Sequence, residues 1–180
     1  MAATFDWQAD TGAATGSPAK GTTRTTGITD NNWKNIDDST TAYSAAPITA
    51  GANSYERWVF GKFSGTFNQI LAGLWAHTLT AFGTGLTLKG APAGSSQLTY
   101  TTPSTTANSN LSTDMTTAIS IASGVLVEFG ATGPEASGKA TSMTTNPCYT
   151  NYLTSQLQTT SGAAAGDTAN VTLTLQYQEN

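Results

Sequence analysis

Alternation of apolar and polar residues is the strongest pattern in the chain, and it is clearest near the C-terminus. In residues 170–178, Val171, Leu173, Leu175 and Tyr177 fall on one face, while Thr and Gln fall on the other. A strict period of two over about eight residues is typical of a β-strand with one buried face. This segment therefore predicts a strand that covers the core with one side and meets solvent with the other.

A second run, residues 55–63, is apolar on both faces. Val59 and Phe63 share one face under a period of two, and Trp58 and Phe60 share the opposite face. Aromatic and β-branched residues favour strands. Large apolar groups on both sides predict a central strand, or a strand with a second contact surface.

Further strands are predicted wherever short β-favouring runs lie between Gly, Pro and Asn signals. They are residues 66–71, 74–78, 84–89, 97–102, 118–121, 124–130 and 149–158. Gly73, between two of these runs, is a candidate β-bulge. About seven or eight strands with turns between them predict an all-β fold, a β-sandwich of the jelly-roll or Ig-like type, with the strand order left open.

The N-terminal quarter of the chain lacks this alternation. Residues 11–29 carry four glycines and a proline among Thr and Ala, with no sustained period of two or 3.6. We therefore predict two regions: residues 1–45 as an extended N-terminal arm or loop, and residues 46–180 as the sandwich domain.

Large aromatic side chains bracket the predicted arm, and they are the best candidates for contact with a partner. An isolated Trp in a polar segment is expected to be buried, either on its own sandwich or against a neighbouring subunit. The candidate partner-binding residues are Phe5, Trp7, Trp33 and Trp58.

Composition supports the all-β prediction. Thr, Ala, Gly and Ser make up more than half the chain, and Thr, which is β-branched, favours strands. Only 10% of the residues are charged, against about 25% in an ordinary soluble domain. So little charge predicts weak solubility of the free monomer, and this favours a protein that functions as part of an assembly.

Charge and cysteine content also narrow the function. With seven Lys and Arg and a net charge of −4, binding to nucleic acid through phosphate neutralisation is not expected. No stretch approaches the roughly 20 apolar residues of a membrane helix, and no Sec-type signal is visible at the start. The single Cys excludes an internal disulfide framework.

Candidate chemistry is sparse. His77 is the only His and Cys148 the only Cys; a catalytic role for either needs a partner that no motif provides, so we expect both to be structural. Acidic residues could ligate calcium or act as paired catalytic carboxylates, but their positions favour solvated loops or ion pairs. The acids concerned are Asp6, Asp10, Asp37, Asp38, Glu56 and Glu128. We expect no enzymatic activity and no metal or cofactor.

Several segments together resemble virion structural proteins of tailed bacteriophages. They are residues 46–58, 63–70, 84–87, 100–103 and 169–179. The similarity lies in the residue pattern of these segments and in their order along the chain, and it includes no catalytic motif.

This resemblance extends over roughly residues 46–180 and implies a small β-sandwich protein present in many copies on a capsid or tail. It implies a capsid decoration or cement protein that bridges major capsid protein subunits and contacts copies of itself as a homo-oligomer. It also implies a virion location after assembly in the host cytoplasm, with no nucleic-acid or membrane partner.

Two physical arguments favour the same role. Low charge permits wide polar-neutral contacts with little charge desolvation, and an extended arm can add a strand to a neighbour's sheet edge. On this hypothesis, deletion of residues 1–45 weakens capsid attachment and leaves the sandwich folded. The alternatives are a phage tail, neck or fibre component, and a carbohydrate-binding module whose aromatic rings stack on sugars.

Overall fold

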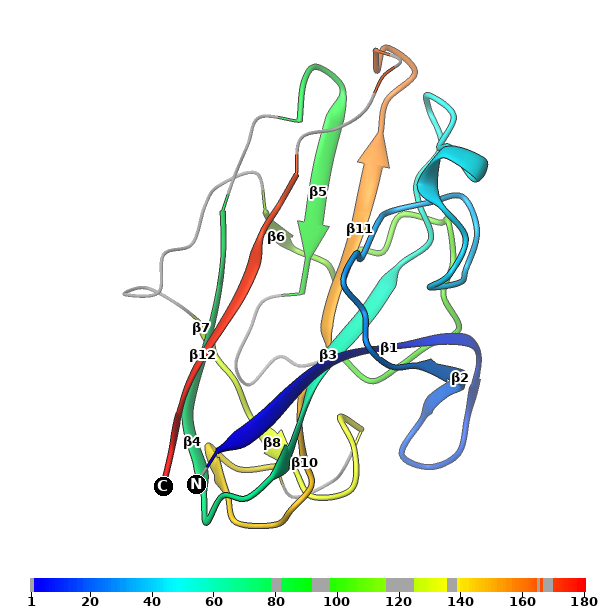
Figure 1. Cartoon of the computed structure of the whole chain (residues 1–180). Coiled ribbons are helices and arrows are strands. Elements are labelled where there is room, and N and C mark those ends of the chain that lie inside the picture. The colour runs from blue at the N-terminus through cyan, green and yellow to red at the C-terminus, as the bar shows by residue number, and fades with distance from the viewer. Residues whose placement is uncertain are drawn as a thin grey trace.

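The structure, a computed structural model, describes residues 2–78, 82–91, 98–115, 125–135, 139–164, 166 and 170–180. Within this part the chain is all-β, and every pair of neighbouring strands is antiparallel (Figure 1). The only helical element described there is a 3₁₀ turn, η1 (Tyr43–Ala45). The predicted fold class is thus confirmed.

The larger sheet runs in the order β2-β1-β3-β11-β5-β6, and β10 pairs with the far end of β3 and with β8. Its strands are β1 (Ala3–Thr15), β2 (Lys20–Thr25), β3 (Arg57–Gly65), β5 (Leu86–Gly90), β6 (Thr113–Asp114), β8 (Phe129–Gly130), β10 (Cys148–Thr150) and β11 (Leu153–Thr159). The smaller sheet runs in the order β12-β4-β7, and β9 also pairs with β4. Its strands are β4 (Ile70–His77), β7 (Val125–Leu126), β9 (Ser142–Met143) and β12 (Leu173–Glu179).

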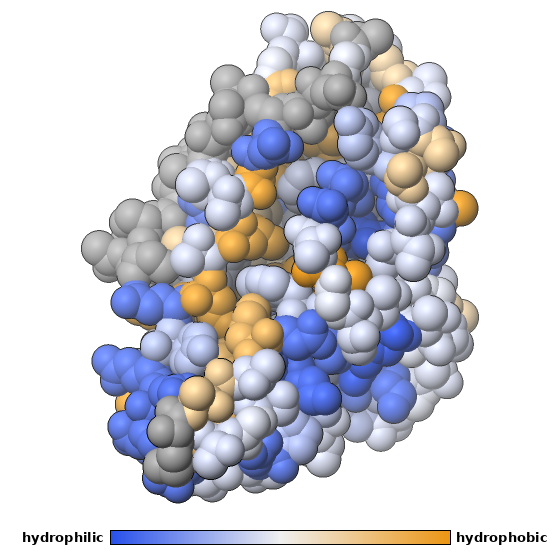
Figure 2. Space-filling model, in the orientation of Figure 1, coloured by the Kyte–Doolittle hydropathy of each residue, from blue (hydrophilic) through white to orange (hydrophobic). Residues whose placement is uncertain are grey.

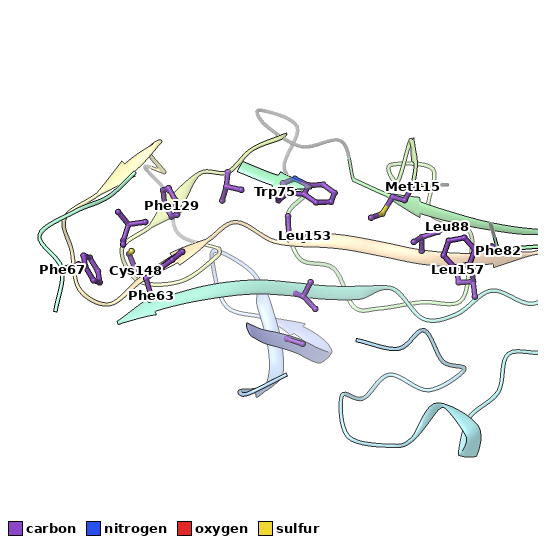
Figure 3. Close-up of a cluster of buried hydrophobic side chains, with 14 residues drawn as sticks. Phe63, Phe67, Trp75, Phe82, Leu88, Met115, Phe129, Cys148, Leu153 and Leu157 are labelled. Carbon is purple, nitrogen blue, oxygen red and sulfur yellow. The ribbon is translucent and has the colours of Figure 1, made fainter. Parts of the chain in front are cut away.

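The main hydrophobic core lies between the two sheets, as a β-sandwich requires (Figure 3). The rings of Phe63 from β3 and Phe129 from β8 meet at 5.9 Å between centroids, and Tyr177 of β12 packs on Phe63 at 4.6 Å. Phe82 and Leu157 lie toward the other end of the same row of side chains. Strand β12 contributes as predicted, with its apolar positions half-buried and its Thr and Gln exposed.

The second face of β3 packs on a separate cluster. Trp58 and Phe60 lie there with Tyr100 and Tyr152, all four nearly inaccessible to solvent. The Trp58 ring stands 5.0 Å from Tyr100 and 5.4 Å from Tyr152, between ring centroids. Because β3 is hydrogen bonded to β1, β10 and β11, it is a central strand buried on both faces, and the prediction from its sequence is confirmed.

An ion pair with a buried carboxylate lies at the edge of this second cluster. Asp10 of β1 accepts hydrogen bonds from Nε and Nη2 of Arg24, both at 2.7 Å, and from the Tyr152 hydroxyl. The Arg24 guanidinium lies over the Phe60 ring, 4.6 Å from its centroid. The carboxylate is thereby satisfied in a place with almost no access to water, as a buried charge requires.

The two predicted strands 66–71 and 74–78 are replaced by one continuous strand, β4, which begins only at Ile70, so residues 66–69 are not strand. The register of β4 against β12 shifts between Leu71 and Leu74, which places an extra residue in β4 there. The bulge expected at Gly73 is therefore present. A side chain at this position would collide with the core, since a Cβ on Gly73 would lie 2.7 Å from the Phe129 ring.

The expectation of a free N-terminal arm is not confirmed. Strand β1 pairs with β3 from Ala3 to Asp10 and with β2 further along, so this segment is part of the larger sheet. Its alternation is concealed because Ala and Thr, which are poor markers of polarity, occupy most positions. The glycines mark structure inside the hairpin: Gly12 has a positive φ at a shift of register, and Gly16, also at positive φ, lies in the turn.

Other strand predictions are corrected in detail. Residues 98–102 have no strand partner, and Tyr100 packs on the second cluster. Within the predicted run 124–130, the described residues 125–130 contain two short strands, β7 and β8, and the run 149–158 is divided between β10 and β11. The predicted strand 118–121 lies outside the described residues.

Deletion of residues 1–25 is expected to unfold the domain, contrary to the expectation for an independent arm. The deletion removes the pairing of β1 with β3 and takes Phe5, Trp7 and Ala9 out of the main core. Loss of one large core side chain alone costs about 3–5 kcal/mol. Near-ultraviolet circular dichroism and thermal unfolding of the truncated chain should show no cooperative transition at room temperature or above.

Tyr43→Ala, at a side chain that is 48% exposed, is the control and should change the free energy of unfolding by less than about 0.5 kcal/mol. A truncated chain that unfolds at the wild-type temperature would contradict the result.

Candidate functional site

A groove of about 1220 Å³ opens on one side of the sandwich, between the start of β12 and the segment 28–50. Figure 2 shows apolar side chains gathered along a hollow on this face of the molecule. The floor comes from the larger sheet, where Trp7, Val59 and Leu157 reach it from three different strands. The groove is thus the margin of the main core, exposed where the sheets are open to solvent.

The apolar walls of this groove are only half-buried. Seven side chains both pack against the main core and line the groove: Trp7, Ile28, Trp33, Ile48, Leu86, Val171 and Leu173. Apolar surface concentrated in one place on a soluble domain marks an interaction site. We therefore take this groove as the candidate functional site.

Hydrogen bonds to the larger sheet fix the wall formed by residues 28–33. The backbone N–H of Ile28 donates to the carbonyl of Trp7 at 3.0 Å. Further along, Trp33 Nε1 donates to Ser155 Oγ at 3.1 Å, and the Trp33 ring meets Phe82 edge-on at 6.4 Å between centroids. The two tryptophans are held in place before any ligand arrives.

Two buried cations anchor the loop behind this wall. Lys34 Nζ donates to Asp38 Oδ1 and to the Thr41 carbonyl, each at 2.7 Å. Arg57, at the start of β3, donates to Asn31 Oδ1 at 3.1 Å and to the Asp38 carbonyl. Partial burial opposes ionisation of Asp38, but hydrogen bonds from Lys34 and Thr41 outweigh it and hold the pKa of this carboxyl below its usual range. The loop of residues 31–41, which lies behind this wall, is therefore anchored to the rest of the fold by these hydrogen bonds.

Only two of the four aromatic residues proposed from the sequence reach the groove. Trp7 and Trp33 line it. Phe5 is half-buried against Phe63, 5.1 Å away between centroids, and is not among the groove residues. Trp58 is 1% exposed, which corrects the prediction for this residue: in the folded chain its ring is not available to a partner.

Sequence reasoning missed most of the aliphatic side chains of the groove. Ile28 and Ile48 are isolated apolar residues in polar loops, and Leu86 opens a strand, so no periodic pattern singled them out. For Val171 and Leu173 the sequence predicts a buried face. Placing them in the groove requires knowing that their strand lies at the edge of its sheet. That position depends on strand order, which the sequence left open.

The one described thiol and the one described imidazole are both buried. Cys148 has no accessible surface, and burial raises its pKa to about 11, so the thiol is protonated at neutral pH. His77 is 2% exposed on β4, with its ring 5.7 Å from that of Trp75. Burial lowers the pKa of His77, and a hydrogen bond with the backbone at Thr78 opposes this shift only in part.

Two further carboxyl groups, Glu56, which is buried, and Asp37, which is half-buried, are withdrawn from full contact with solvent. Glu56 accepts a hydrogen bond from Asn108 Nδ2 at 2.7 Å, and Asp37 accepts one from the N–H of Gly12 at 2.7 Å. Burial raises the pKa of both carboxyl groups. Across the ranges that the structure describes, no three His, Cys, Asp or Glu side chains are grouped so as to hold a metal ion. No helix in those ranges is long and apolar enough to span a membrane.

Comparison with known proteins does not extend these observations. No protein-family model matches the chain, and neither curated proteins nor solved structures give a match.

The buried imidazole predicts a loss of stability in mild acid. In the folded state burial keeps the pKa of His77 below its usual 6.5, so the unfolded chain binds the proton more readily. The contribution of His77 is therefore intact above about pH 6.5 and falls as the pH drops below it, by at most about 1.4 kcal/mol per pH unit. Chemical denaturation at pH 7.5 and pH 5 should show this loss.

His77→Gln provides the comparison, because the amide does not titrate. The raised pKa values of Asp37 and Glu56 act in the opposite direction, but both proteins share them. The free energy of unfolding of the wild type should fall relative to His77→Gln between the two pH values. An equal change in both proteins would show that His77 does not titrate on unfolding.

Proposed function

We propose that the chain is a non-enzymatic structural protein of a tailed-bacteriophage virion, which decorates the capsid and cements neighbouring major capsid protein subunits. The observation that carries the proposal is the half-exposed apolar groove on a sandwich that has little charge. Such a surface suits lasting contact with another protein. The resemblance of residues 46–180 to phage virion proteins supplies the identity of that partner.

The chemistry of the surface supports this role. Only 10% of the residues are charged, and Asp30 is the one charged residue among the described residues of the groove. A contact built from apolar, Thr and Asn side chains avoids the cost of removing water from charges. Many such contacts repeated over a shell hold firmly even when each one is weak.

The two tryptophans of the groove favour a second candidate, a carbohydrate-binding module. Trp rings offer flat apolar platforms on which sugar rings stack, and Trp7 and Trp33 both line the same hollow. A glycan array separates this candidate from the first, because a cement protein needs no sugar ligand. A tail, neck or fibre component would use the groove as a cement protein does and differs in copy number.

The first test is the number of copies in purified virions, measured by quantitative mass spectrometry against the major capsid protein. A fixed simple ratio to the capsid protein is expected, because a cement protein occupies every equivalent position on the shell. A few to a few dozen copies, as an order of magnitude for a single symmetric ring, would move the protein to the neck or tail. Its absence from virions would overturn the proposal.

Two isoleucines in the same covering segment provide a matched pair of variants for the contact itself. Ile48 lines the groove, whereas Ile36 is 41% exposed and is not among the groove residues. Ile48→Lys is expected to weaken attachment to capsids by about tenfold or more, because it places a charge in an apolar contact. Ile36→Lys should leave attachment unchanged. Both proteins are titrated onto capsids that lack the wild-type chain, and equal attachment of the two would show that the groove is not the contact.

A further inference from the structure

The strand beside the groove is an edge strand. Of the strands the structure describes, β12 pairs only with β4. The N–H of Thr78 donates to the carbonyl of Thr172 at 3.1 Å, and this bond sets the phase of the ladder. Because antiparallel pairs alternate, the peptide groups of Leu173 and Leu175 point away from β4.

The outer edge of β12 and the groove lie together. The groove is lined by the consecutive residues 170–173, which lead into β12 and include its first residue, Leu173. Its other walls come from residues 28–33, 43–44 and 47–50 and from Leu86, Thr159, Ala163, Ala164 and Gly166, and Trp7 is on its floor. A row of peptide groups that no described strand pairs therefore borders an apolar trough.

We propose that this edge accepts an extended segment of a partner protein, which pairs with β12 and inserts alternate apolar side chains into the groove. A strand satisfies the outward peptide groups of β12, which a helix, whose backbone groups are already paired, leaves unsatisfied. The pleat then directs every second side chain onto the apolar trough and the others toward solvent.

Charge complementarity defines the partner further. Asp30 is the sole charged residue in the described lining and is exposed at the rim. A segment that is otherwise neutral, with Lys or Arg placed to meet Asp30, fits this surface. A second copy fits less well, because each chain carries a net charge of −4 and would bring a further carboxylate to the rim.

This inference rests on the proposed function and adds how the capsid protein would be bound, namely through an extended segment that pairs with β12. Its test does not depend on the virion, since it uses the isolated chain and synthetic peptides. If the protein is absent from virions, the strand-pairing proposal is unaffected. If the peptide does not bind, the proposed role on the capsid is unaffected.

The probe is a short capped peptide, Lys-Val-Thr-Leu-Thr-Val-Thr-Leu-Thr, titrated onto the full chain. Binding is followed by tryptophan fluorescence, and hydrogen exchange of the Leu173 and Leu175 amides reports on strand pairing. We expect saturable binding and protection of both amides. Replacing the peptide's Lys by Glu should weaken binding several-fold. N-methylation of alternate peptide amides should abolish binding in one register and spare it in the other.

Two variants near the start of β12 locate the contact. Val171 lines the groove, whereas Thr174 is exposed on the opposite face of β12. Val171→Lys should weaken binding of the peptide by about tenfold or more, and Thr174→Lys should bind as the wild type does. Thermal unfolding of both variants establishes that each is folded.

Four outcomes would overturn the proposal. The first is absence of binding, and the second is equal binding by both N-methylated registers, which would mean apolar contact without strand pairing. The third is protection of the Leu173 and Leu175 amides in a dimer that forms without peptide, which would make a second copy the occupant. Equal affinity of Val171→Lys and Thr174→Lys would place any bound peptide elsewhere.

Discussion

Burial of β3 on both faces is the constraint on which the rest of the structure depends. Val59 and Phe63 belong to the core between the sheets, and Trp58 and Phe60 belong to the cluster on the other side. Both faces must be covered by chain, which explains why a domain with only one sandwich core carries long segments outside its two sheets. Residues 28–50 and 98–111 help to cover these faces, and residues 28–50 also form a wall of the groove.

Scarcity of charge is the second constraint, and it explains how the covering segments are held. The few charges present are used inside the fold: Asp10 with Arg24, Lys34 with Asp38, and Arg57 with neutral acceptors. Partly exposed ion pairs contribute little, whereas buried and fully hydrogen-bonded ones fix a geometry at the risk of a large penalty if broken. Lys34, Asp38 and Arg57 position the loop that follows Asp30, and Asp10 with Arg24 ties β1 to β2.

The sequence predicted those parts of the fold where alternation contrasts apolar with polar residues. The faces of β12 were predicted from such alternation, whereas the double burial of β3 followed from apolar residues on both its faces and the bulge at Gly73 from a glycine between two β-favouring runs. The β1–β2 hairpin was missed because Ala, Thr and Gly carry almost no such contrast, so tertiary pairing with β3 determines its structure. The candidate site was half predicted: Trp7 and Trp33 stood out as isolated aromatics, but the aliphatic walls come together only through strand order.

Strand order also explains why the groove lies where it does. The larger sheet joins its strands along β2-β1-β3-β11-β5-β6, while the smaller one places β12 at an edge of a much narrower ladder. A narrow sheet cannot cover a wide one, so some core side chains of the wide sheet reach the surface beside its partner's edge. Near the C-terminus, Tyr177 and the Phe5 ring close that gap, at 6.4 Å between centroids. Toward the start of β12 no such aromatic pair bridges the described residues, and the same core therefore ends as an open trough beside unpaired peptide groups.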